Sequence, residues 1–110
     1  MPEYLVEAAY TPEAWATFLK NPQDRTEAAR RLTESLGGRL ETVRLSFGEY
    51  DVVLIINLPD NASAAALSMI LSAGGALKAI KTTPLLSVEE GVEAMRKGGA
   101  AGTSYRPPAG

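Results

Sequence analysis

The stretch Phe47-Gly48-Glu49-Tyr50-Asp51-Val52-Val53-Leu54-Ile55-Ile56 decides the fold of this chain. A turn that contains glycine leads directly into an unbroken apolar run, and Tyr50 and Asp51 stand where the turn meets that run. A strand with apolar residues on both sides of its pleat is typical of a sheet that is covered on both faces. The stretch therefore predicts a doubly covered strand, and it makes Tyr50 and Asp51 the first candidates for a binding site.

The residues around this turn predict a four-stranded sheet. Residues 39–47 form the strand before the turn, with Val43, Leu45 and Phe47 on one side, and residues 51–58 form the strand after it. The connection is short, which favours an antiparallel hairpin. Further strands are expected at residues 3–10 and 77–85.

Helices are expected between these strands, because each intervening segment begins with a capping residue and ends at glycine or proline. Thr11-Pro12 starts a helix over residues 12–19, and a second helix over 23–36 ends at Gly37-Gly38. Asp60 or Asn61 caps a third helix that stops at Gly74-Gly75. Ser87 caps a final helix that we expect to end near Lys97-Gly98-Gly99.

The element order is β-α-β-β-α-β with a C-terminal helix, which is an α+β, ferredoxin-like arrangement. Helices would cover one face of the four-stranded antiparallel sheet, and the chain has no further element large enough to cover the other. We therefore expect a homodimer in which two sheets pack face to face as a dimeric α+β barrel, and such dimers could build larger assemblies. The domain is expected to span residues 1–99, followed by a tail over 100–110.

Composition excludes several classes of function. The 110 residues include 11 basic and 13 acidic side chains, a net charge of −2, so a nucleic-acid partner is not expected. There is no cysteine and no histidine, which excludes disulfides, a thiolate nucleophile, Cys/His zinc sites and a haem histidine. No acidic cluster suits a metal, and we expect no cofactor. Neither a signal peptide nor an apolar run long enough to span a membrane is evident, so we expect a soluble cytoplasmic protein.

Four short motifs give the chain a resemblance to a known family. They are the opening Met1-Pro2-Glu3-Tyr4-Leu5-Val6, the turn Phe47-Gly48-Glu49-Tyr50-Asp51, the segment Lys81-Thr82-Thr83-Pro84-Leu85-Leu86 and the tail Tyr105-Arg106-Pro107-Pro108. In this order they resemble the GYD-domain proteins, a family that lacks an established biochemical role. The resemblance implies a dimeric α+β barrel. That fold group includes cofactor-free monooxygenases, lactone isomerases, haem enzymes and ligand-sensing domains, so the fold does not choose the function.

Four polar residues are expected on the sheet face opposite the helices. If the apolar side chains of residues 39–47 face the helices, Arg44 points the other way. By the same alternation, Glu7, Lys81 and Thr83 share its face. One interpretation is a polar pocket for an anionic or carbonyl-bearing small molecule. The other is a paired structural network or exposure at a sheet edge, since buried ion pairs are often purely structural.

The turn residues also allow two interpretations. Asp51 could act as a base and Tyr50 as a hydrogen-bond donor or acid. Alternatively, Gly48 supplies a positive φ, Asp51 caps backbone N–H groups and Tyr50 packs. Glycine and aspartate are residues that turns ordinarily require, which favours the structural interpretation.

Three functions remain open from the sequence. The preferred one is a homodimeric barrel that binds a small molecule or acts as an interaction or regulatory module. The second is a cofactor-independent enzyme of the monooxygenase or isomerase kind that uses Asp51, Tyr50 and Arg44. The third is an assembly module with a filled interface. The aromatic residues Tyr10, Trp15 and Phe18 could line a ligand-binding mouth or simply belong to the core, and the tail with Tyr105 could dock on a partner subunit or stay loose.

Overall fold

The computed structural model describes residues 1–109 of the chain; Gly110, the last residue of the predicted tail, lies outside them. The elements in chain order are β1 (Glu3–Tyr10), α1 (Pro12–Lys20), α2 (Thr26–Ser35), β2 (Arg39–Leu45), β3 (Val52–Asn57), α3 (Asn61–Ala73), β4 (Leu77–Leu85), α4 (Val88–Ala101) and the 3-10 turn η1 (Gly102–Ser104). Within residues 1–109, none of the helices is long and apolar enough to cross a membrane.

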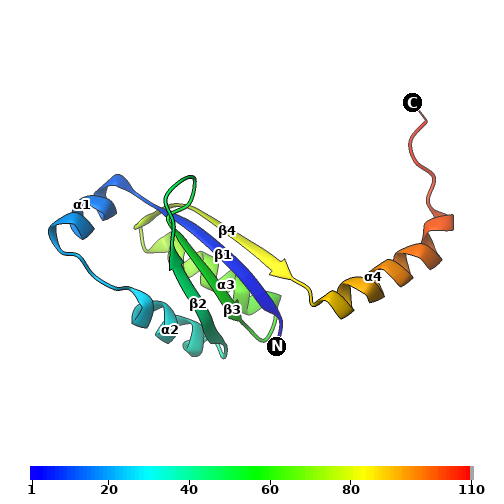
Figure 1. Cartoon of the computed structure of the whole chain (residues 1–110), viewed down its shortest axis with the longest axis horizontal. Coiled ribbons are helices and arrows are strands. Elements are labelled where there is room, and N and C mark those ends of the chain that lie inside the picture. The colour runs from blue at the N-terminus through cyan, green and yellow to red at the C-terminus, as the bar shows by residue number, and fades with distance from the viewer. Residues whose placement is uncertain (110) are drawn as a thin grey trace.

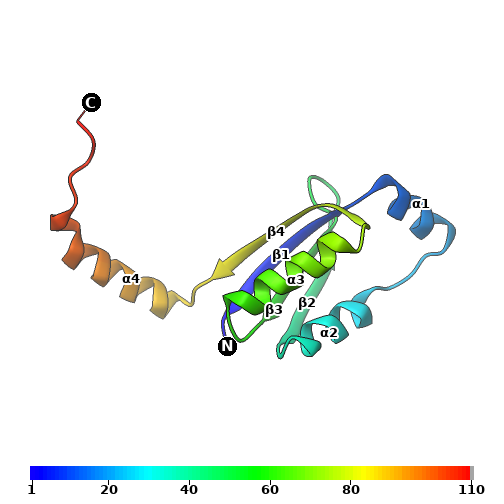
Figure 2. The ribbon, with the colours of Figure 1, turned by 180° about the vertical axis from the view of Figure 1, so that it is seen from behind.

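The four strands form one antiparallel sheet in the order β2-β3-β1-β4 (Figure 1). Helices α2 and α3 lie on one face of this sheet, as the view from behind shows (Figure 2). Within the described residues the opposite face carries no helix. The predicted α+β class and the open four-stranded antiparallel sheet are therefore confirmed.

The core forms between the sheet and the two helices. Every second residue of β3 is buried, as the pleat requires, and its alternate residues are half-exposed. Tyr4 lies fully inside, and its hydroxyl donates to Asn61 Oδ1 over 2.7 Å, which ties β1 to the start of α3. The buried cluster comprises Tyr4, Val6, Leu54, Ile56, Leu58, Ala64 and Leu67.

Side-chain caps start three of the helices where the sequence indicates. The Thr11 hydroxyl accepts from Ala14 N, the Asp60 carboxylate accepts from Ser63 N over 2.8 Å, and Ser87 forms a full capping box with Glu90. The hydrogen bonds from Ser63 lower the pKa of Asp60 below its ordinary value. Of the two candidate caps for α3, Asp60 is therefore the one used.

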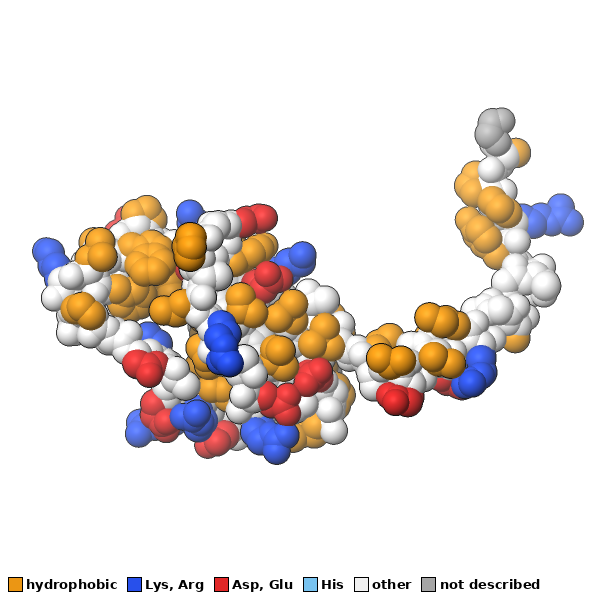
Figure 3. Space-filling model, in the orientation of Figure 1, with side chains coloured by type: hydrophobic (Ala, Val, Ile, Leu, Met, Phe, Trp, Pro, Cys, Tyr) orange, Lys and Arg blue, Asp and Glu red, His pale blue; other side chains and the backbone are white. Residues whose placement is uncertain are grey.

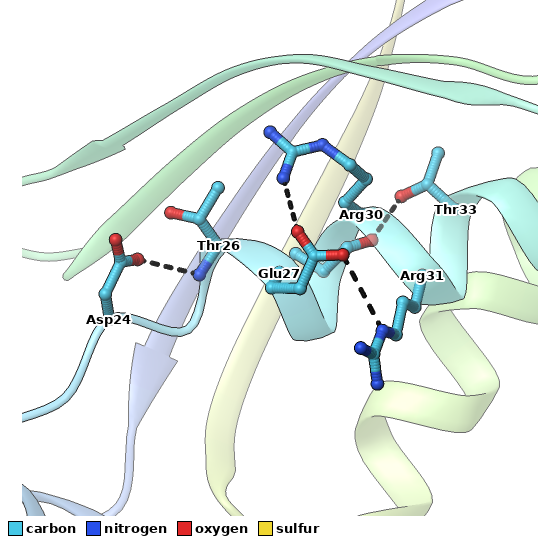
Figure 4. Close-up of polar contacts among 7 residues, drawn as sticks. Asp24, Thr26, Glu27, Arg30, Arg31 and Thr33 are labelled. Atoms are coloured by element: carbon cyan, nitrogen blue, oxygen red, sulfur yellow. Dashed lines mark hydrogen bonds and ion pairs between the residues drawn. The ribbon is translucent and has the colours of Figure 1, made fainter.

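Helix α2 begins later than predicted, at Thr26 instead of Gln23 (Figure 4). Asp24 Oδ1 accepts from the Thr26 backbone N–H over 2.8 Å, and the residues before it remain outside the helix. Glu27 forms ion pairs with Arg30 and Arg31, at 2.7 and 3.6 Å, on the exposed side of the helix. Asp24 is the second residue of the predicted segment, and its hydrogen bond from Thr26 lies at the first residue of the observed helix.

Several predictions about the hairpin are wrong in detail. Strand β2 ends at Leu45, and a bulge between Leu40 and Thr42 interrupts its alternation. Val43 packs on the core, and the register places Leu45 on the same side of the sheet, as predicted, although Leu45 is 76% exposed. Phe47 lies beyond the end of the strand and is fully exposed. Gly48 does not have a positive φ: the glycines with that conformation are Gly37, after α2, and Gly75, before β4.

The C-terminal helix also departs from the prediction. Helix α4 does not end at Gly98-Gly99 but continues to Ala101, and η1 follows it. It extends away from the sheet as an arm that carries the C-terminal tail (Figure 1). The radius of gyration is 17.8 Å, whereas a compact chain of this size has about 13 Å. We call residues 88–105 the C-terminal arm.

Candidate functional site

The strand register places three of the predicted polar residues in one row on the open face of the sheet. Arg44 pairs with Val53, Val53 with Glu7, and Glu7 with Lys81. Directly paired residues point to the same side of a sheet, with Cβ atoms about 5 Å apart. The row therefore runs across all four strands, in the order Arg44, Val53, Glu7 and Lys81. We call it the charged row, because it holds one carboxylate and two basic groups.

The next row on the same face is apolar apart from its two ends. Thr42, Ile55, Leu5 and Thr83 pair in sequence, so the fourth predicted residue, Thr83, also lies on the open face. Leu5, Val53 and Ile55 are half-exposed at the centre of this face. Figure 3 shows hydrophobic side chains over the sheet, with charged side chains around them. We call the residues of these two rows the open face.

The charges of the first row are not neutralised within the chain. In the part of the chain that the structure describes, no ion pair joins Glu7 to Arg44 or Lys81. Arg44 Nη1 instead donates to the Val43 carbonyl over 2.8 Å. The arrangement can bind an anionic group between Arg44 and Lys81, or it can pair with charges on another surface.

A second polar group at the end of the open face was not singled out from the sequence. Arg39 pairs with Asn57 and Asn57 with Glu3, while Arg39 Nη2 donates to Glu41 Oε1 over 2.8 Å. A hydrogen bond with Glu41 raises the pKa of Glu3, and the bond from Arg39 lowers that of Glu41. Asn57 Oδ1 is buried without a hydrogen-bond partner among residues 1–109. The bulge brings Glu41 here, and a plain alternation pattern gives no signal for it.

Asp51 holds the hairpin to the end of β1. Its Oδ2 accepts from Tyr10 N over 2.9 Å and from Trp15 Nε1 over 3.3 Å. Its backbone N–H donates to the Ala8 carbonyl, and its carbonyl accepts from Ser46 N, both over 2.8 Å. The side chain of Asp51 thus caps a backbone N–H group, although that group lies on another strand and not in the turn.

Tyr50 lies beside Asp51, and both residues accept hydrogen bonds from Ser46. Tyr50 is half-buried, and its carbonyl accepts from Ser46 Oγ over 2.8 Å. Tyr50 and Asp51 stand at the opposite end of the sheet from Glu3 and Asn57, and they are not in the charged row. The structure therefore brings Glu7, Arg44 and Lys81 into one row, and it places the two turn residues apart from that row.

The predicted aromatic residues form a cluster at the end of β1. The rings of Tyr10, Trp15 and Phe18 meet edge to face, with centroids 4.9 to 5.9 Å apart. Burial raises the pKa of Tyr10, the charge of Arg25 opposes that change, and the charge of Asp51 adds to it. The cluster joins α1 to the sheet.

A groove of about 1040 Å³ opens beside this cluster, on the helix side of the sheet. Helices α1, α2 and α3 form its walls and β3 contributes to its floor. Most residues that line it are apolar, and Asp24 and Arg25 are the charged residues from the segment before α2. Arg44 borders the groove from β2, although the register places its side chain on the open face. We call this space the helix groove. The spacing of apolar residues in the sequence does not predict it, because the groove depends on the position of α1 relative to α2.

Comparison with known proteins identifies the family. A curated relative, the "Glutamine synthetase and cystathionine beta-lyase binding protein" of Thermus thermophilus, is 28% identical over 78 residues, which cover 71% of this chain and 82% of the relative. No solved structure matches the chain significantly. The family model of the GYD domain matches residues 4–95, which is most of the chain and includes both the charged row and the turn at Asp51. The chain therefore belongs to the GYD domain family.

Proposed function

We propose that this protein is a homodimeric interaction module: two copies pair through their open faces, and the dimer binds other proteins. The observation that carries the proposal is the uncovered face of the sheet, with Leu5, Val53 and Ile55 at its centre. Burial of apolar surface contributes about 25 cal/mol per Å², so such a face favours a partner surface over water.

A second copy is the simplest cover for this face. Two identical sheets that pack about a two-fold axis bury the same patch on both copies. Charged residues of the row would then pair across the interface or lie at its rim. Either outcome removes the cost of burying Glu7 without a partner.

The binding role draws on the curated relative. That protein is named for its binding to two metabolic enzymes, glutamine synthetase and cystathionine β-lyase. Of the two interpretations of the turn, the contacts of Asp51 fit the structural one, since both Tyr10 N–H and Trp15 Nε1–H bond to the same carboxylate oxygen. An interaction module needs no catalytic base at this position.

The binding role is tested with purified glutamine synthetase and cystathionine β-lyase as probes against the immobilised chain. We expect saturable binding of at least one enzyme, and weaker binding when Ile55→Asp disrupts the dimer. Met69→Asp, on the exposed side of α3, is the matched control and should bind as the wild type does. If neither enzyme binds the wild type at concentrations of tens of micromolar, the interaction role proposed from the relative is wrong.

A second candidate function is the binding of a small anion in the space between two open faces. Its observation is the row with Arg44 and Lys81 on either side of Glu7, without ion pairs in the described residues. Thr83 would offer a hydroxyl on the adjacent row. Small mono- and dicarboxylates, added in a thermal-shift assay, should stabilise the wild type and not a Lys81→Ala variant. Equal shifts for both proteins would contradict a site at this row.

A further inference from the structure

Among residues 1–109, the element that α4 contacts most extensively is the adjoining turn η1, and α4 does not pack on the sheet. Val88 is 80% exposed and Met95 73% exposed, and with Val92 they lie on one side of the helix. Leu86, just before the arm, and Tyr105, at its end, are also exposed. Figure 3 shows hydrophobic side chains open to solvent along the arm.

Such a helix is not stable by itself. A helix of 14 residues is marginal in water even with an alanine-rich sequence. Gly91, Gly98 and Gly99 lie inside α4, and each costs about 1 kcal/mol relative to alanine. A Cβ atom at any of them would meet nothing within 4 Å. The arm therefore needs contacts from another surface to hold this conformation.

The helix groove is an apolar surface that also lacks an occupant. Its walls include Ala14 and Phe18 of α1, Ala28 and Leu32 of α2, and Ile70 and Leu71 of α3. Asp24 and Arg25 contribute one charge of each sign to its lining. The exposed apolar side of α4 and the groove are thus complementary in apolar character.

The arm cannot fill the groove of its own chain. Leu85, where the arm leaves the sheet, pairs with Glu3, whereas the groove is lined by Ala76 and Leu77 at the other end of β4. Strand β4 is about 30 Å long and α4 about 21 Å. Helix α3 packs on β4 (Figure 2) and forms one wall of the groove.

We propose that α4 of one copy docks in the helix groove of a second copy, with Val88, Val92 and Met95 toward the groove. In a two-fold pair with antiparallel strands, each arm leaves the sheet beside the α1 end of the other copy. Both arms are then exchanged in the same dimer. This placement of the arm rests on the proposed pairing of the open faces, and different variants test the two contacts.

The absence of cysteine in the chain allows a direct test. Met95→Cys is prepared in one sample and Ile70→Cys in another; the two are mixed, allowed to exchange subunits and oxidised. We expect a disulfide between the two variants, detected by mass. The matched controls are Lys97→Cys, on the polar side of α4, and Met69→Cys, which does not line the groove. Either control should lower the yield of the mixed disulfide severalfold.

A second variant tests the energetics without a cross-link. Met95→Gln retains a good helix former but removes an apolar side chain, so exchange of the arm should weaken by roughly tenfold. Lys97→Gln should leave it unchanged. Equal yields from Met95→Cys and Lys97→Cys, or cross-links to Met69→Cys as abundant as to Ile70→Cys, would overturn the groove as the docking site. If the mixed disulfide forms while Ile55→Asp has no effect on mass, only the pairing of open faces fails.

Discussion

At the scale of single residues, Asp51 connects the hairpin to the end of β1 and to α1. Its carboxylate accepts N–H groups from residues 41 and 36 positions earlier in the chain. The sequence indicates an aspartate with a capping role, because the turn around it requires such residues. Its partners could not be predicted, since they depend on the pairing of β3 with β1 and on the placement of α1.

Replacement of Asp51 should therefore lower stability. Asp51→Ala leaves Tyr10 N–H and Trp15 Nε1–H without their acceptor, and the free energy of unfolding should fall by about 1–3 kcal/mol. Asp51→Asn keeps one carbonyl oxygen and should lose less. Urea unfolding measures both changes. An alanine variant as stable as the wild type would show that these two hydrogen bonds contribute nothing to the free energy of unfolding.

Glu3 gives a prediction about pH. Its pKa is raised in the folded state by the hydrogen bond with Glu41. Its contribution to stability is therefore present below the ordinary value of 4.5 and is lost as the pH rises through the higher folded value. Glu3→Gln cannot ionise, so the variant should be more stable than the wild type at pH 7, and this gain should vanish in acid. A gain that is equal at both pH values in thermal unfolding would contradict the Glu3–Glu41 contact.

At the scale of the elements, local signals predicted the helix starts well. Thr11, Asp60 and Ser87 cap their helices as expected, because a cap involves only neighbouring residues. The alternation that placed Glu7, Arg44, Lys81 and Thr83 on one face also agrees with the observed register. The bulge in β2 and the early end of this strand could not be predicted, since cross-strand pairing and not local sequence decides them.

Gly38, just before β2, and Gly48, in the hairpin turn, should respond differently to alanine. A Cβ atom at Gly38 would lie 2.0 Å from the Asn57 carbonyl oxygen, so Gly38→Ala should lower the free energy of unfolding by about 3 kcal/mol or more. Gly48 has open space around it and no positive φ, so Gly48→Ala should change stability by less than about 1 kcal/mol. Thermal unfolding of the two variants gives the comparison. A severe loss of stability in Gly48→Ala would contradict the absence of a positive φ at Gly48.

At the scale of the whole molecule, the chain exposes two apolar surfaces that a compact domain would cover. The sequence predicted the first, the open face, from the apolar run after the turn. It did not predict the second, the C-terminal arm, because Gly98-Gly99 indicates a helix end, whereas α4 continues past both residues. Because of its glycines, α4 has a low intrinsic helix propensity, which is consistent with a helix that depends on contacts with another molecule.

Sedimentation equilibrium of the wild type and of Ile55→Asp tests the pairing of open faces most directly. The wild type should have the mass of a dimer of 11.7 kDa chains at micromolar concentration. The variant places a carboxylate at the centre of the open face, and its dissociation constant should rise at least about a hundredfold, because an unpaired buried charge costs several kcal/mol. Met69→Asp should sediment as the wild type does. A wild type that stays monomeric at these concentrations, or an Ile55→Asp variant that dimerises equally well, would contradict the account.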